Sequence, residues 1–151
     1  MTTFENLFAE YPCTLTDASV KVAVEEILAK HFDDNNNAEV WKQCLHSIDL
    51  TTLNGEDTTE KVETMAQRVN EFEENFPGVP NVAAMCVYPS LVQTVADTLT
   101  EPIGIAAVAA GFPASQTFIE VKIAEAAMAV AAGATEIDIV ISIGKFLEGN
   151  Y

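Results

Sequence analysis

The chain has 151 residues, 49% of them hydrophobic, and carries a formal net charge of −16. This length and composition predict a folded chain with a buried core and exclude a disordered polypeptide. The seven basic residues are scattered among 23 acidic ones, which argues against nucleic acid and membrane partners, because anionic phosphates bind clustered lysines and arginines.

The first 47 residues are predicted to form a helical extension outside the main domain. The opening stretch MTTFENLFAEYP lacks the basic and apolar regions of a signal peptide, which predicts a cytoplasmic protein. Residues 16–32 then carry apolar side chains at helical spacing, with Thr16 or Asp17 as the capping residue. The extension is assigned to residues 1–47 and the main domain to residues 48–151.

From residue 48 onward, short apolar segments alternate with amphipathic ones. Strands are predicted to start near residues 48, 82, 103 and 136, with helices over 57–76, 89–99 and 115–133 between them. This order indicates an α/β fold with a parallel sheet and right-handed crossovers. The strands are apolar at nearly every position, which is typical of strands buried on both faces. The spacing fits an open doubly wound sheet and a closed barrel equally.

The ends of the predicted helices have recognisable signals. The helix over 57–76 begins at Asp57-x-x-Glu60, which resembles a capping box, and the helix over 115–133 begins at Ser115 or Thr117. Gly133 is predicted to end that third helix as a C-terminal cap. No G-x-G-x-x-G follows the first strand, which argues against dinucleotide binding.

Asp138 is the polar residue that fits its apolar strand least. In EIDIVISI its neighbours Ile137 and Ile139 point to the opposite face, and a buried carboxylate must be paired, hydrogen-bonded or protonated. A catalytic role and a structural role stay equally open for it. Asp49 lies nearer the start of its strand, which favours a structural role. Cys86 has no histidine base nearby in the sequence, which favours a buried hydrophobic role over a nucleophilic one.

Four motifs in order carry a family resemblance: IDLTTLN at 48–54, AAMCVYP at 83–89, GFP at 111–113 and EIDIVISIGKFLEGNY at 136–151. Together they resemble the 2-deoxy-D-ribose-5-phosphate aldolase family. The resemblance implies a partial (β/α)8 TIM barrel with strands 1–4 and helices 1–3. It also implies cleavage of deoxyribose 5-phosphate, a small phosphorylated sugar, to acetaldehyde and glyceraldehyde 3-phosphate. The cleavage proceeds through a lysine Schiff base, without metal or other cofactor.

The same resemblance assigns roles to individual residues. Asp138 matches the carboxylate that relays protons beside the Schiff-base lysine. Asp49 and Thr51 match polar residues at the floor and wall of the substrate pocket. Cys86 matches a cysteine close to the substrate that is not the nucleophile.

The chain departs from the family in its lysines. The family's Schiff-base lysine lies on the sixth strand in a KTSTG-type motif, and this motif is absent here. The resemblance therefore predicts an N-terminal fragment of an aldolase that is inactive alone. A second interpretation is a half-barrel assembly module that pairs with a second copy, as a homo-oligomer, or with a C-terminal half. A third is an open-sheet enzyme that uses Asp49 and Asp138 as an acid–base pair.

Overall fold

The computed structural model describes residues 3–151, which divide into two compact units. One unit holds the residues up to 41 together with Tyr151, and the other holds residues 42–150. The domain boundary at residue 47 stays a prediction. Among residues 3–151, no helix is both long and apolar enough to cross a membrane.

Three helices make up the N-terminal part: α1 (Thr3–Glu10), α2 (Asp17–Asn35) and α3 (Ala38–His46). Of the two predicted caps of α2, the structure uses Thr16. The Ser19 amide donates to Thr16 Oγ1 at 3.2 Å, and the Thr16 amide donates to Ser19 Oγ at 2.9 Å. This reciprocal pair satisfies backbone donors that the first turn leaves without helical partners.

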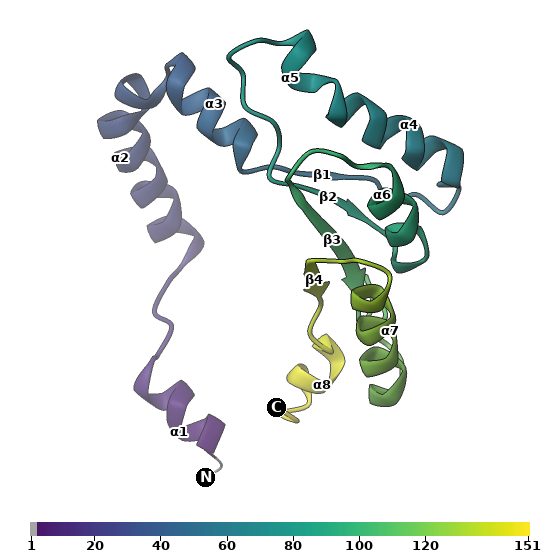
Figure 1. Ribbon diagram of the computed structural model, residues 1–151. Helices are drawn as coiled ribbons and strands as arrows, with labels where there is room; N and C mark the ends of the chain where they lie inside the picture. The colour runs from purple at the N-terminus through teal and green to yellow at the C-terminus, as the bar shows by residue number, and fades with distance from the viewer. Residues whose placement is uncertain (1–2) are drawn as a thin grey trace. The chain divides into compact units, whose positions relative to one another are not determined.

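Residues 42–150 contain a parallel sheet with the strand order β1-β2-β3-β4 (Figure 1). The strands are β1 (Asp49–Thr51), β2 (Ala84–Val87), β3 (Gly104–Ala109) and β4 (Glu136–Ile139). Each strand pairs in parallel with the next one along the chain. The predicted alternation of strands and helices is confirmed.

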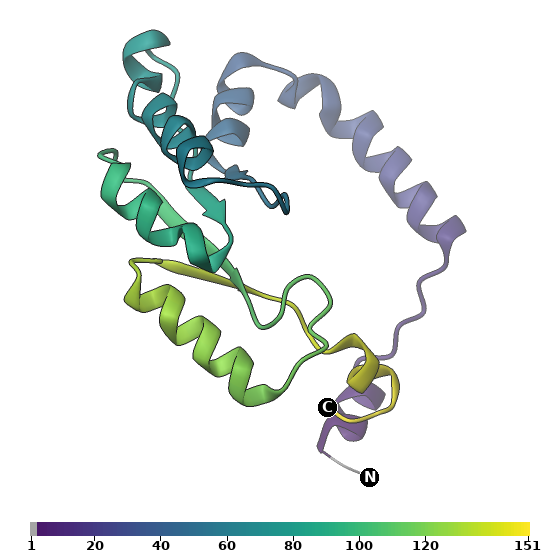
Figure 2. The same ribbon diagram turned by 90° about the vertical axis from the view of Figure 1, so that its right-hand side faces the viewer.

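The connecting helices are α4 (Thr59–Asn70), α5 (Phe72–Asn75), the 3₁₀ turn η1 (Pro89–Leu91), α6 (Val92–Thr98) and α7 (Ile119–Ala131). A short helix, α8 (Ile143–Leu147), follows β4. Figure 2 shows α4, α6 and α7 along one side of the sheet. The helix predicted over 57–76 is interrupted at Glu71, which ends α4.

Two predicted helix starts are wrong. The cap of α4 is Thr58, whose hydroxyl accepts from the Lys61 amide at 3.2 Å, whereas Asp57 bonds to the preceding loop. Helix α7 starts at Ile119 rather than at Ser115 or Thr117, and no side chain caps it. The C-terminal signal is confirmed, because Gly133 has a φ of +110°, which favours glycine.

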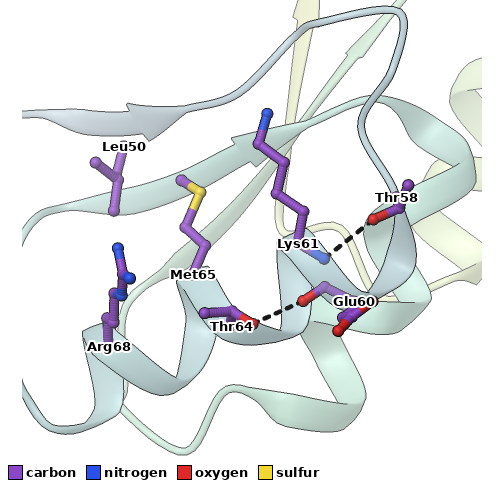
Figure 3. Close-up of a pocket in the computed structure, with 7 residues that line it drawn as sticks. All are labelled: Leu50, Thr58, Glu60, Lys61, Thr64, Met65 and Arg68. Atoms are coloured by element: carbon purple, nitrogen blue, oxygen red, sulfur yellow. Dashed lines mark hydrogen bonds between the residues drawn. The ribbon is translucent and has the colours of Figure 1, made fainter.

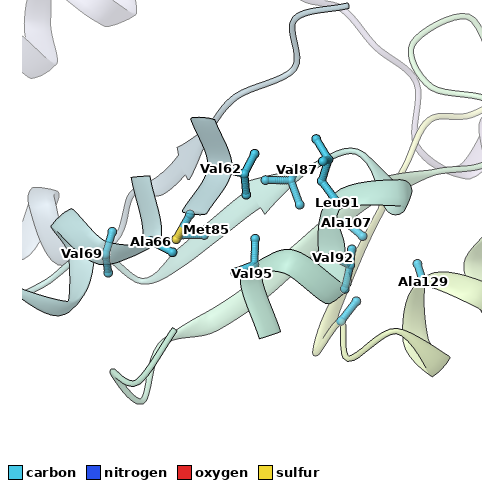
Figure 4. Packing of buried hydrophobic residues seen from close by; sticks show 11 residues of the cluster. Val62, Ala66, Val69, Met85, Val87, Leu91, Val92, Val95, Ala107 and Ala129 are labelled. Carbon is cyan, nitrogen blue, oxygen red and sulfur yellow. The ribbon is translucent and has the colours of Figure 1, made fainter. Parts of the chain in front are cut away.

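The main core lies between the sheet and the helices (Figure 4). It consists of Val62, Ala66, Val69, Met85, Val87, Leu91, Val92, Val95, Ala107, Ala129 and Ala134. Strand β2 is buried throughout, as its apolar sequence predicted. The prediction of burial on both faces is wrong for β1 and β4, whose residues are exposed or half-buried. Both are edge strands of this sheet, so each has a neighbouring strand on one side alone.

Candidate active site

The register of the sheet brings the predicted site residues to one face. Side chains alternate between the faces of a strand, and residues paired across neighbouring strands share a face. Thr51 pairs with Cys86, and Asp138 pairs with Val108. The face opposite the helices is called the inner face below. It consists of Asp49, Thr51, Ala84, Cys86, Ala106, Val108, Glu136 and Asp138.

Cys86 and Asp138 meet across the inner face. They come from β2 and β4, which β3 separates, and β3 presents the small side chains of Ala106 and Val108 there. Cys86 Sγ therefore reaches Asp138 Oδ2, at 3.7 Å, and donates a hydrogen bond to the carboxylate. Asp138 itself is exposed, and the burial predicted from the sequence is wrong, because β4 is an edge strand.

The Cys86 thiol keeps its proton at neutral pH. The pKa of the thiol is raised from 9.0 to about 11, first by burial and next by the negative charge of Asp138. The charge of Asp49 adds to this rise, whereas a contact with the Thr51 side chain opposes it. A nucleophilic cysteine requires a thiolate. The environment of Cys86 therefore favours a protonated thiol that donates a hydrogen bond over a nucleophile.

Asp49 and Thr51 form the β1 side of the inner face. Both are exposed, and Thr51 Oγ1 donates to the Asp49 carbonyl oxygen at 2.9 Å. Asp49, Thr51 and Asp138 all affect the pKa of the Cys86 thiol, so the four predicted site residues act on one another. This group offers two aspartate carboxylates, a hydroxyl and a neutral thiol, which suits proton transfer and the binding of polar substrates.

Asp57 fixes the loop that follows β1. Its side chain is 1% exposed and accepts hydrogen bonds from Thr52 Oγ1 at 2.9 Å and the Asn54 amide at 3.0 Å. It also forms an ion pair with Lys61, and this cation is the main cause that lowers the pKa of Asp57 to about 2. The sequence predicted a helix-capping role, and the structure replaces it with a bracing role in the loop.

Glu136 is an inner-face residue that sequence reasoning missed. The signal was present, since Glu136 precedes Asp138 by two positions and strand alternation places both on one face. A Cβ atom added at Gly104 would overlap with Glu136 Oε1. Glycine at this position of β3 therefore leaves room for the Glu136 side chain. The inner face thus carries the carboxylates of Asp49, Glu136 and Asp138.

No strand among the described residues carries a lysine. All six lysines of the chain lie on helices: Lys21 and Lys30 on α2, Lys42 on α3, Lys61 on α4, Lys122 on α7 and Lys145 on α8. Lys145 Nζ pairs with Glu148 at the surface, at 3.3 Å. In residues 3–151, no group of three His, Cys, Asp or Glu side chains is placed to hold a metal ion.

A pocket of about 570 Å³ lies beside β1, on the face that the helices cover. Leu50 of β1 and Met65 of α4 form its apolar wall, and Lys61 and Arg68 project into the same space (Figure 3). Because Leu50 alternates with Asp49 along β1, this pocket is on the opposite side of the sheet from the inner face. It is therefore separate from the candidate active site.

Comparison with known proteins supports the same family. Residues 44–147 match the sequence model of the DeoC/LacD family of aldolases. Human and mouse proteins named deoxyribose-phosphate aldolase are each 37% identical to the chain, over 115 and 116 residues. These matches cover 69% of this chain and 36% of each relative.

Two solved structures share the fold. One is an aldolase named QR15, with a TM-score of 0.61 and 25% identity over 71% of this chain and 44% of that one. The other is a deoxyribose phosphate aldolase from Aeropyrum pernix, described as tetrameric. Its TM-score is 0.58, with 23% identity over 73% of this chain and 44% of that one. The predicted fold class, a partial (β/α)8 barrel with strands 1–4 and helices 1–3, is confirmed.

The chain spans 36% to 44% of the length of these relatives and neighbours. The matched residues nevertheless include all four strands and every inner-face residue, from Asp49 to Asp138. The chain belongs to the DeoC/LacD family of aldolases.

Proposed function

We propose that this chain supplies the carboxylate half of a deoxyribose-phosphate aldolase active site. The reaction is the cleavage of deoxyribose 5-phosphate into acetaldehyde and glyceraldehyde 3-phosphate through an imine on a lysine. The observation that carries the proposal is the contact between Cys86 and Asp138 on an inner face that also holds Asp49 and Thr51. Relatives named deoxyribose-phosphate aldolase add support.

In this proposal Asp138 relays protons. Formation and hydrolysis of an imine require several proton transfers, and a carboxylate within hydrogen-bond reach of the amine or of a water can perform them. The Cys86 thiol donates to Oδ2 and so orients the carboxylate, while the exposure of Asp138 leaves it open to an amine or a water. Asp49 and Thr51 contribute polar groups to the floor and wall of the substrate pocket.

The amine of the reaction comes, in this proposal, from outside these 151 residues. A lysine attacks a carbonyl in its neutral form, which requires desolvation or a neighbouring cation. The six lysines here lie on helices, and Lys61 and Lys145 are paired with carboxylates. The 151-residue polypeptide alone is therefore proposed to have no aldolase turnover.

A second candidate function is assembly without catalysis, and the edges of the sheet favour it. Ile139 is 67% exposed and Ile141 is 63% exposed, at the open edge beside β4. Exposed apolar side chains next to an unpaired strand edge favour association with another chain. Pairing with a C-terminal half or a second copy would cover them. Size-exclusion chromatography with light scattering tests this function, and a stable monomer at all concentrations counts against it.

The aldolase proposal is tested by turnover. The 151-residue chain is assayed for acetaldehyde release from deoxyribose 5-phosphate, alone and fused to the four remaining βα units of a family aldolase. We expect no release from the chain alone and measurable release from the fusion. In the fusion, Asp138→Asn lowers kcat by about 100-fold or more, since a positioned acid–base group contributes at least this factor.

The matched control for this substitution is Asp97→Asn. Asp97 is an exposed aspartate of α6 whose carboxylate bonds to Gln93 on the same helix, so its charge does not act on the inner face. We expect the control fusion to keep its turnover. Release from the unfused chain, or an Asp138→Asn fusion as active as the parent, contradicts the proposal.

A further inference from the structure

The loop that joins β3 to α7 has an unusual backbone. Ala110, Gly111 and Ser115 have φ values of 63°, 73° and 54°. Residues with a Cβ atom rarely adopt this left-handed region and keep it only where surrounding contacts hold them there. From this loop Phe112 packs against the inner-face cluster that contains Cys86. Whatever holds the loop therefore also fixes one wall of the inner face.

Two charged side chains one turn apart on α7 contact this loop. Glu125 Oε2 accepts from the Gly111 amide at 2.9 Å. Lys122 Nζ donates to Ser115 Oγ at 2.6 Å and to Ser142 Oγ, beyond the end of β4, at 2.5 Å. These are hydrogen bonds to charged groups, which are stronger than neutral ones.

Ser115 links the loop directly to the segment that follows β4. Its side chain is buried, and its hydroxyl donates to the Val140 carbonyl oxygen at 3.1 Å. Figure 2 shows the loop after β3 beside the segment that leads from β4 to α8. Lys122 thus contacts a hydroxyl on each side of the junction between these two segments.

The partners of Lys122 distinguish it from a solvated surface lysine. Lys61 and Lys145 pair with carboxylates, whereas Lys122 is half-buried and bonds to two neutral hydroxyls. An ammonium in this position gives up part of its hydration without gaining a counter-charge from these partners. The ammonium instead links two segments of the chain, because it bonds to Ser115 and to Ser142, which lie 27 residues apart in the sequence.

We propose that Lys122 is a positioning residue which, together with Glu125, braces the loop at 110–115 against the end of β4. The brace keeps Phe112 against the cluster of Ala84, Cys86, Ala106 and Val108, and so shapes one wall of the inner face. Lys122 touches no reacting atom in this role. The inference goes beyond the proposed function, because the brace shapes the inner face whichever reaction takes place there.

The Cys86 thiol can report on the brace. In a Cys13→Ser, Cys44→Ser background, Cys86 is the one remaining cysteine of the chain. Because Cys86 is 2% exposed, its alkylation by iodoacetamide requires the side chains packed around it to move. Lys122→Met keeps an apolar stem of similar length but removes the ammonium. We expect it to raise the labelling rate about tenfold, which corresponds to the loss of one hydrogen bond to a charged group.

Two further variants serve as controls, one at the same position and one at a different lysine. Lys122→Arg keeps the donors, so we expect its labelling rate to stay within about twofold of the parent. Lys145→Met removes the cation paired with Glu148 on the surface and is expected to leave the rate unchanged. Amide exchange at Gly111 gives an independent readout. It should speed up in Lys122→Met and in Glu125→Ala, while the Val87 amide in β2 stays protected.

The outcomes decide the inference. A Lys122→Met rate equal to the parent overturns it, and so does a Lys122→Arg rate as high as that of Lys122→Met. If Lys122→Met unfolds the chain, Ser142→Ala is tested in its place. This substitution removes one of the two hydroxyl partners of Lys122 and leaves the lysine itself intact. An unchanged labelling rate and unchanged Gly111 exchange in Ser142→Ala then overturn the brace. These readouts need no substrate, so they are independent of whether the aldolase proposal succeeds.

Discussion

The charge of Asp138 is expected to control how strongly Cys86 holds its proton. The thiol pKa of about 11 lies two units above the ordinary value of 9.0, so at any pH below 9 Cys86 has about 100-fold less thiolate than an exposed cysteine. Burial is the larger cause and Asp138 the next. Asp138→Asn removes the charge but leaves the burial. We therefore expect the pKa of Cys86 to fall part of the way back and to stay above 9.

The assay follows iodoacetamide labelling of Cys86 against pH in the background without Cys13 and Cys44. The midpoint of the rate profile gives the thiol pKa, and ultraviolet absorbance of the thiolate checks it. Asp97→Asn is the control and should leave the midpoint in place. A parent midpoint near 9 refutes the burial argument. A midpoint that is the same with and without Asp138→Asn refutes the proximity of the two side chains.

Three further predictions concern stability. Val95 is 0% exposed, so Val95→Ala should lower the free energy of unfolding by about 2–3 kcal/mol in urea denaturation, while Val130→Ala at a 56% exposed site should change it by less than about 0.5 kcal/mol. Thr58→Ala removes the cap of α4 and should lower the free energy of unfolding by about 1 kcal/mol, whereas Glu60→Ala should lower it by less than about 0.5 kcal/mol. Equal losses would support the capping box at Asp57 and Glu60 that the sequence predicted. Asp57 stabilises the fold fully above its unfolded pKa of 3.8, and this stabilisation is lost as the pH falls from 3.8 through about 2. Acid unfolding followed by circular dichroism should therefore depend less steeply on pH in this window in Asp57→Asn, and an unchanged profile would contradict the bracing role.

The arrangement of the sheet was predictable because it depends on periodicity. Apolar runs and helical stripes set the order of strands and helices, and a two-residue period puts Asp49 with Thr51 and Glu136 with Asp138. Parallel pairing of consecutive strands then brings Cys86 into the same group. These features follow from rules that act within one segment or between neighbouring strands.

The contacts of the loops were not predictable in this way. Asp57 satisfies the same spacing rule as a helix cap, but its carboxylate is taken up by three donors of its own loop and by the Lys61 ammonium. Serine is a residue type that often caps helices, yet Ser115 adopts a left-handed backbone conformation in the loop before α7. Such choices depend on which side chains arrive from distant segments. The exposure of Asp138 likewise depends on what lies next to β4, and its own apolar strand does not reveal this.

The central claim is that these residues provide the proton relay of an aldolase site and that the amine comes from outside them. Borohydride trapping of the fusion with deoxyribose 5-phosphate, followed by mapping of the adduct by mass spectrometry, tests this claim most directly. The predicted result is an adduct on a lysine outside residues 1–151, which forms more slowly in the Asp138→Asn fusion. An adduct on one of the six lysines of this chain, or adduct formation that is indifferent to Asp138, would contradict it.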